Sequence, residues 1–107
     1  MTYTMELTIG HNVAGAPVFS TDETIDLASE YLELEAFTAF ECVGFWHGMR
    51  ETSTRIELCG LTDDDVARIT AAIPTLAAAM GQECIMCETR PDRVQFIERY
   101  TIAAAIA

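Results

Sequence analysis

The order in which two hydrophobic periodicities follow one another constrains the fold of this chain most. Residues 3–9 alternate between apolar and polar types, as expected for a strand with one buried face. Residues 22–34 then carry apolar side chains at helical spacing, and Ser20 with Glu23 forms a capping-box signature just before them. The first third of the sequence therefore predicts a strand, a loop and a helix.

The rest of the chain repeats this pattern with one additional strand. Residues 37–48 are rich in aromatic and β-branched types and residues 53–59 alternate, so we expect a hairpin with a short loop between them. Thr62 and the three acids that follow it predict a second helix start, and Pro74 predicts a kink or a split in that helix. Residues 83–88 alternate as a fourth strand.

This succession predicts an α+β domain with ferredoxin-like βαββαβ topology. Right-handed crossovers and short connections favour a four-stranded antiparallel sheet with two helices on one face. We expect the domain to occupy residues 1–90. Residues 91–107 are expected to be a C-terminal extension, with 94–97 as a short strand or helical turn and an apolar, helix-prone tail at 102–107 that packs on a partner or frays.

Charge restricts the class of partner. The chain has 107 residues and a formal net charge of -11, which argues against binding to a nucleic-acid backbone or an anionic membrane. Self-repulsion that favours solubility is the simplest interpretation of this charge, and a surface that meets a basic protein or mimics nucleic acid is the alternative. All six basic residues are Arg, a bias typical of GC-rich genomes such as those of actinobacteria or their phages.

The sequence carries no recognisable signal for membrane insertion or secretion, and no complete metal-binding motif. No apolar run approaches the length that spans a bilayer, and residues 1–6 lack the features of a signal peptide, so we expect a cytoplasmic protein. The four cysteines are expected to be buried thiols rather than disulfides. Cys84 and Cys87 have half the spacing of a zinc ribbon, but on one strand they would point to opposite faces. We therefore expect no metal and no other cofactor.

The predicted topology brings polar loops together at one end of the sheet. The loop after the first strand, the hairpin between the second and third strands, and the start of the fourth strand all lie there, and loops on a rigid scaffold commonly carry function. Surface loops are also polar in the absence of any site. We expect a ligand-binding rim at this end, formed by His11, Asn12, Trp46, His47, Arg50, Glu51 and Gln82, with Glu83 beside them.

No catalytic motif accompanies this rim. His47 or Glu51 has the chemistry of a general base, and Arg50 suits an anionic substrate. No Ser or Cys nucleophile is tied to them by a motif, and no glycine-rich phosphate loop is present. We therefore assign no catalytic residue from the sequence.

The sheet face that the helices leave open is a second candidate site. Side-chain parity mixes aromatic and charged residues there, and a half-apolar face favours cover by a second copy of the chain. We expect a homodimer through this face. The predicted face comprises Glu6, Thr8, Phe40, Cys42, Trp46, Arg55, Glu57 and Cys59.

Three short motifs resemble an uncharacterised family of small bacterial proteins. That family has the pattern G-x-W, then E-x-S before a strand, then F-G-Q-E-x-V after a helix. Here the motifs are Gly44-Phe45-Trp46, Glu51-Thr52-Ser53 and Met80-Gly81-Gln82-Glu83-Cys84-Ile85, with Met for Phe and Ile for Val. The resemblance covers about residues 37–88. It implies the architecture and draws attention to Trp46, Glu51, Ser53 and Gln82, but it implies no activity.

Three functions are compatible with these observations. The first is a small acidic binding or interaction protein, homodimeric, of a phage or mobile element. The second is a small ferredoxin-like enzyme, such as an isomerase or cofactor-free oxygenase, with a His or Glu base. The third is an acidic inhibitor that mimics nucleic acid, with its carboxylates on the two helices. A cavity at the predicted rim favours the second, and a continuous stripe of carboxylates favours the third.

Overall fold

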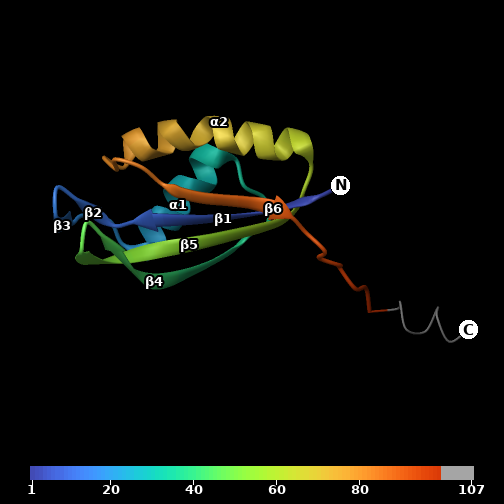
Figure 1. Ribbon diagram of the computed structural model, residues 1–107, viewed down its shortest axis with the longest axis horizontal. Coiled ribbons are helices and arrows are strands. Elements are labelled where there is room, and N and C mark those ends of the chain that lie inside the picture. The colour runs from blue at the N-terminus through green and yellow to red at the C-terminus, as the bar shows by residue number, and fades with distance from the viewer. Residues whose placement is uncertain (100–107) are drawn as a thin grey trace, which may run out of the picture.

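The computed structural model describes residues 1–99 and has the predicted α+β architecture (Figure 1). A four-stranded antiparallel sheet has the order β4-β5-β1-β6, which is the βαββαβ arrangement, and a two-stranded hairpin, β2–β3, lies outside it. The elements are β1 (Tyr3–Gly10), β2 (Asn12–Val13), β3 (Ala16–Pro17), α1 (Thr21–Leu32), β4 (Thr38–Trp46), β5 (Met49–Leu61), α2 (Asp63–Ala79) and β6 (Met86–Pro91).

Both helices begin where the capping signals predict. Ser20 and Glu23 form a reciprocal capping box at the start of α1, and Thr62 and Asp65 do the same at α2. These side chains satisfy backbone N–H groups that have no partner within the helix. The two helix starts are therefore fixed locally, before any packing is considered.

The core lies between the helices and one face of the sheet. β1 contributes Met5, Leu7 and Ile9, which are fully buried. Ala28 and Leu32 of α1, Ile69 and Leu76 of α2, and Ile56 and Leu58 of β5 pack in the same cluster. Because strand side chains alternate, the other face of β1, with Glu6 and Thr8, is left uncovered by the helices.

Pro74 does not split the second helix. α2 runs without interruption from Asp63 to Ala79, although Pro74 lacks the N–H that would bond back along the helix. The buried side chains of Ile69 and Leu76 hold the helix to the sheet on both sides of Pro74. Packing on both sides therefore offsets the lost hydrogen bond.

The structure differs from the predicted elements most clearly in three places. The chain turns at His47 and Gly48, so residues 49–52, predicted as loop, belong to β5. The predicted loop at 10–20 contains the β2–β3 hairpin. The fourth strand was predicted at 83–88 but begins at Met86, because the backbone after α2 first turns through Gly81 at a φ of +64°.

The prediction of buried cysteines is wrong. Cys59, Cys84 and Cys87 are exposed and Cys42 is half-buried, and all four are free thiols. The later start of β6 leaves Cys84 in the preceding loop, and the edge position of β6 leaves Cys87 uncovered.

The chain after β6 leaves the domain as an extended segment (Figure 1). Residues 94–97, predicted as a short strand or helical turn, form neither. The predicted tail at 102–107 lies outside the described residues. Within residues 1–99, no helix has the length and apolar character needed to cross a bilayer.

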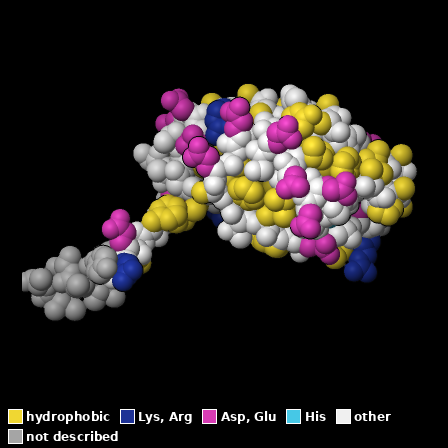
Figure 2. All heavy atoms as spheres, turned by 180° about the vertical axis from the view of Figure 1, so that it is seen from behind, with side chains coloured by type: hydrophobic (Ala, Val, Ile, Leu, Met, Phe, Trp, Pro, Cys, Tyr) yellow, Lys and Arg dark blue, Asp and Glu magenta, His cyan; other side chains and the backbone are white. Residues whose placement is uncertain are grey.

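The face of the molecule seen from behind Figure 1 carries separate carboxylates between hydrophobic side chains (Figure 2). On this face the acidic residues do not merge into one continuous stripe. This distribution gives no particular support to mimicry of a nucleic-acid backbone, which requires regularly spaced negative charge.

Candidate functional site

A cavity of about 330 Å³ lies at one end of the open sheet face. We call it the sheet-end cavity. It is bounded by the open face of β1, β4, β5 and β6, by the β2–β3 hairpin and by the loop between α2 and β6. Its lining residues are Thr8, Gly10, Asn12, Ala14, Gly15, Gly44, Phe45, Trp46, His47, Met49, Glu51, Ser53, Gly81, Gln82, Glu83, Cys84 and Met86.

Two strand glycines make room for the polar floor of the cavity. A Cβ atom at Gly10 would lie 2.7 Å from Oε2 of Glu51, and one at Gly44 would lie 2.9 Å from Oγ of Ser53. Both distances are too short for real atoms, so any larger residue at either position would displace its neighbour. Glycine within a strand commonly marks such a close approach. The two glycines therefore allow Glu51 and Ser53 to occupy their observed positions.

A chain of hydrogen bonds joins three segments around Glu51. The backbone N–H of Asn12 donates to Oε2 of Glu51 over 3.1 Å. The carbonyl of Asn12 accepts a hydrogen bond of 2.6 Å from the side-chain amide of Gln82. The first hairpin, the middle strand β5 and the loop after α2 are thereby fixed relative to one another.

The opposite wall carries an aromatic pair and a second carboxylate. The indole N–H of Trp46 donates to Oε2 of Glu83 over 3.3 Å. The imidazole of His47 packs edge-on against Trp46, with ring centroids 4.7 Å apart, and its Nε2 lies 3.9 Å from the same Glu83 oxygen. Trp46 nevertheless remains 46% exposed, so its ring is accessible to a ligand.

The structure brings together five of the seven residues of the predicted rim. Asn12, Trp46, His47, Glu51 and Gln82 line the sheet-end cavity, and so does Glu83, which was expected beside them.

The two other predicted residues lie elsewhere. Arg50 is exposed and pairs with Phe45 across the hairpin, outside the cavity lining. His11 is buried, and its Nε2 lies 2.6 Å from Oγ1 of Thr54. Burial lowers the pKa of His11, and the negative charges of Glu41 and Glu51 partly oppose this shift.

Sequence reasoning did not select several lining residues. Gly44 had a detectable signal, because glycine inside a predicted strand marks a close approach. Gly10 had none, because it follows the strand predicted at 3–9. Met49, Met86 and Cys84 had none, because their places depend on where β5 and β6 begin.

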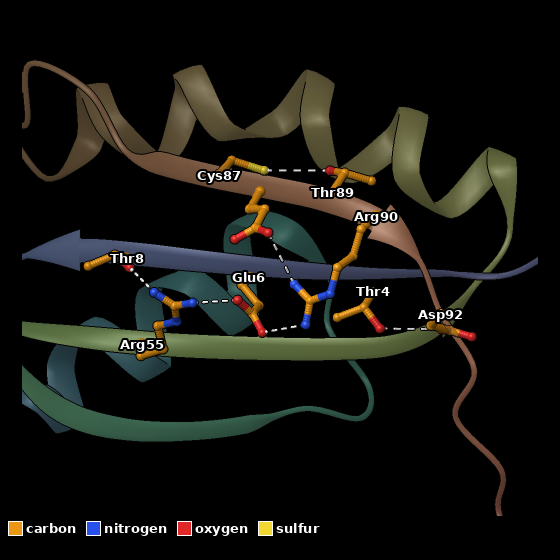
Figure 3. Close-up of polar contacts among 9 residues, drawn as sticks. Thr4, Glu6, Thr8, Arg55, Cys87, Thr89, Arg90 and Asp92 are labelled. Atoms are coloured by element: carbon orange, nitrogen blue, oxygen red, sulfur yellow. Dashed lines mark hydrogen bonds and ion pairs between the residues drawn. The ribbon is translucent and has the colours of Figure 1, made fainter.

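An ion-pair cluster lies beside the cavity on the same open face (Figure 3). Glu6 of β1 accepts hydrogen bonds from the guanidinium groups of Arg55 and Arg90, and Arg90 also pairs with Glu88 over 3.4 Å. Arg55 donates as well to Oγ1 of Thr8 over 3.1 Å. The pKa of Glu6 is lowered, first by the hydrogen bond from Arg90 and then by that from Arg55, against the opposing effect of burial.

Metal-ligand geometry is not found in residues 1–99, where no three His, Cys, Asp or Glu side chains are grouped as they would be around an ion. The functional groups that line the sheet-end cavity are the aromatic rings of Phe45 and Trp46, two carboxylates, an imidazole and side-chain amides. This set suits a ligand with a flat ring system and positive charge.

Comparisons with known proteins found similar folds at low sequence identity. No family model matches the chain, and no curated protein matches its sequence. The solved structures similar to this chain include one of a phage SAM lyase in complex with S-methyl-5'-thioadenosine and one of a phage SAM lyase in the apo state. The first has a TM-score of 0.61 and 20% identity over 83% of this chain and 80% of that chain. The second has a TM-score of 0.61 and 19% identity over 82% and 78%.

Proposed function

We propose that this chain is a phage enzyme that binds S-adenosylmethionine (SAM) in the sheet-end cavity and cleaves it to S-methyl-5'-thioadenosine. The observation that carries the proposal is the combination of an accessible indole, Trp46, with two carboxylates, Glu51 and Glu83, around one cavity. The structural similarity to a phage SAM lyase bound to S-methyl-5'-thioadenosine supports the choice of substrate.

The cavity matches the substrate in size and in charge. Its volume of about 330 Å³ is at the lower end of the range for small-molecule sites, which suits one nucleoside rather than a dinucleotide. Trp46 offers a face on which an adenine ring can stack. The carboxylates and the net charge of -11 attract a sulfonium cation.

The reaction breaks the bond between the sulfonium sulfur and the γ-carbon of the amino-acid chain. The electron pair of that bond passes to sulfur, which becomes the neutral thioether of S-methyl-5'-thioadenosine. The γ-carbon is stabilised either when a base removes a proton from the β-carbon to give an alkene, or when the substrate's own carboxylate closes a lactone ring. Glu51 is the proposed base in the first case, and the lactone route needs no protein base.

The direct test is to incubate the purified chain with SAM and to follow S-methyl-5'-thioadenosine and the amino-acid product by chromatography and mass spectrometry. Release of S-methyl-5'-thioadenosine above the uncatalysed rate is the expected result. Glu51→Gln is expected to lower the rate, and Glu88→Gln is the control, because Glu88 lies on the same sheet face outside the cavity lining. No product and no binding of S-methyl-5'-thioadenosine by the wild-type chain would refute the proposal.

A matched aromatic pair tests the stacking role. Trp46 and Phe40 are both about half exposed and lie on the same face of β4, but only Trp46 lines the cavity. Trp46→Leu is expected to weaken binding of S-methyl-5'-thioadenosine by about tenfold, on the scale of one aromatic contact. Phe40→Leu is expected to leave binding unchanged. Equal effects of the two substitutions would argue against stacking on Trp46.

We also propose that the chain forms a homodimer in which a second copy covers the open sheet face. The exposed side chains of Phe40, Met49 and Met86 on this face favour such cover, because apolar surface gains free energy when it is removed from water. Light scattering at micromolar concentration measures the mass. A dimer that is lost in Phe40→Glu supports the proposal, and a monomer at all concentrations refutes it.

A further inference from the structure

The ion-pair cluster beside the cavity holds a guanidinium group that is only partly engaged. A guanidinium has five N–H donors. One nitrogen of Arg55 donates to Thr8 and another to Glu6, and the guanidinium makes no other hydrogen bond to the described part of the chain. The side chain of Arg55 is 29% exposed on the open side of the sheet, so part of it is accessible from solvent.

Arg55 lies at the edge of the sheet-end cavity. Thr8, to which it donates, is itself a lining residue, and so is Ser53, the preceding residue on the same face of β5. Two residues along a strand correspond to about 7 Å. In SAM, three carbons separate the sulfur from the carboxylate carbon, which is a span of similar length. A ligand whose nucleoside lies between Trp46 and Glu51 therefore has the length to bring its amino-acid carboxylate to Arg55.

The neighbouring Arg90 is already compensated. It pairs with Glu6 and with Glu88, and its pKa is raised by Glu6, Glu88 and Glu57 together. Arg55 shares only Glu6 and has no second carboxylate within ion-pair distance among residues 1–99. Of the two guanidinium groups that contact Glu6, Arg55 is the one that has a single carboxylate partner and that donates to a lining residue of the cavity, Thr8.

We infer that Arg55 binds the α-carboxylate of the substrate and thereby distinguishes amino-acid-bearing adenosyl ligands from the bare nucleoside product. This inference rests on the proposed function and adds the recognition of the amino-acid end. A planar guanidinium binds a carboxylate through two parallel hydrogen bonds. Glu57, two residues further along the same face of β5, supplies an acceptor for the adjacent ammonium group. Product release follows, because S-methyl-5'-thioadenosine lacks the group that Arg55 holds.

The test compares two unreactive ligands that differ only in the amino-acid end. S-adenosylhomocysteine carries that end, S-methyl-5'-thioadenosine does not, and both have a neutral sulfur. Calorimetric titration of the wild-type chain is expected to show tighter binding of S-adenosylhomocysteine. In Arg55→Met this ligand is expected to bind about ten- to a hundredfold more weakly, on the scale of hydrogen bonds to a charged group, while S-methyl-5'-thioadenosine binds as before.

Two further variants isolate the role of Arg55. Arg90→Met also removes a partner of Glu6 but lies farther from the cavity lining, so it is expected to change neither affinity. Arg55→Lys keeps the charge and loses the planar fork, and an intermediate loss is expected for S-adenosylhomocysteine alone. It also serves as the test if Arg55→Met does not fold, as judged by circular dichroism.

The outcomes separate this inference from the proposed function. If the wild-type chain binds both ligands equally, or if both Arg55 variants weaken both ligands to the same extent, the assignment of Arg55 is wrong and the proposed function stands. If the wild-type chain binds neither ligand and forms no product from SAM, the proposed function fails and the inference falls with it. If it binds neither ligand but forms product, only the assignment of Arg55 fails.

Discussion

The two faces of the sheet carry different kinds of residue. On the helix-covered face, Met5, Leu7 and Ile9 of β1 are fully buried and belong to the hydrophobic core cluster. On the open face, Glu6 and Thr8 of the same strand belong to the ion-pair cluster and to the cavity lining. Consecutive residues of one strand therefore belong to the apolar core and to the polar open face in alternation, because strand side chains point to opposite faces.

This comparison predicts how substitutions will divide. A change on the helix-covered face should cost stability and leave the affinity of the folded fraction intact. A change on the open face should lower the affinity for ligand and leave the free energy of unfolding nearly unchanged. The four predictions below test this division, from the largest expected effect to the smallest.

Truncation on the helix-covered face should have the largest effect. Leu7→Ala removes a fully buried side chain and leaves a cavity, so the free energy of unfolding should fall by about 2–5 kcal/mol. Urea denaturation measures this change, and titration with S-methyl-5'-thioadenosine under native conditions should give wild-type affinity. Thr8→Ala, the adjacent residue on the other face, is the counterpart, with a loss of less than about 1 kcal/mol.

Filling the space beside Glu51 should affect the cavity and spare the fold. In Gly10→Ala the new Cβ displaces the Glu51 carboxylate and breaks its hydrogen bond to Asn12, so affinity for S-methyl-5'-thioadenosine should fall by about tenfold. Stability should change by less than about 1 kcal/mol, because alanine is favoured over glycine in a strand by a similar amount. In the double variant with Glu51→Ala, Gly10→Ala should add no further loss of affinity; an additive loss would show that the glycine acts by another route.

His11 makes the helix-covered face sensitive to pH. Its pKa is lowered by burial, so the folded state binds this proton less readily than the unfolded state. The stability that neutral His11 contributes is complete above the unfolded pKa of about 6.5 and declines as the pH falls below it. Melting curves at pH 7.5 and 5.5 should show a loss of stability for the wild-type chain and a smaller loss for His11→Gln.

His47 provides the control for this effect, because its side chain is 74% exposed. The variant His47→Gln should retain the wild-type loss of stability between pH 7.5 and 5.5. If His11→Gln and His47→Gln behave alike, the buried imidazole is not the group responsible.

Asp92 should have the smallest effect, at the end of the sheet away from the cavity. Its carboxylate accepts hydrogen bonds from Oγ1 of Thr2 over 2.6 Å and from the N–H of Gly60 over 2.8 Å, and these, with the Thr2 bond first, lower the pKa of Asp92. This contribution to stability is present above the unfolded pKa of about 3.9 and is lost as the pH falls through the folded pKa. Asp92→Asn should therefore melt below the wild-type chain at pH 7.

The difference between Asp92→Asn and the wild-type chain should shrink as the pH is lowered toward 3, and ligand affinity should not change. Asp26→Asn, at an exposed position on α1, serves as the control and should melt with the wild-type chain at every pH. A difference that persists at pH 3 would mean that Asp92 acts through something other than its charge.

The sequence predicted the elements well because their signals are local. The two capping boxes fix the helix starts, and the alternation in β1 identifies its buried face. The start of β6 and the β2–β3 hairpin were missed, because both depend on packing around Gly81, whose Cα faces Val13 at a distance where a Cβ would lie 3.2 Å from that side chain. Strand ends decided by such long-range contacts leave little trace in a periodicity.

The candidate site was predicted in position but not in detail. Topology alone indicated that Asn12, Trp46, Glu51 and Gln82 gather at one end, and they line one cavity. The burial of His11 was open to inference, because it continues the parity of Met5, Leu7 and Ile9. The position of the Glu51 carboxylate beside Gly10 could not be inferred from the sequence, because side-chain conformation depends on neighbours that only the fold brings together.

The close approach of Glu51 to Gly10 restricts which pairs of residues homologues can carry at these two positions. A lineage that keeps the carboxylate at 51 is bound to keep glycine at 10, because any side chain there would displace it. A lineage that has lost the carboxylate is released from that requirement. Joint inheritance of these two residues, forty-one positions apart in the printed sequence, would therefore mark the homologues in which the cavity is still used.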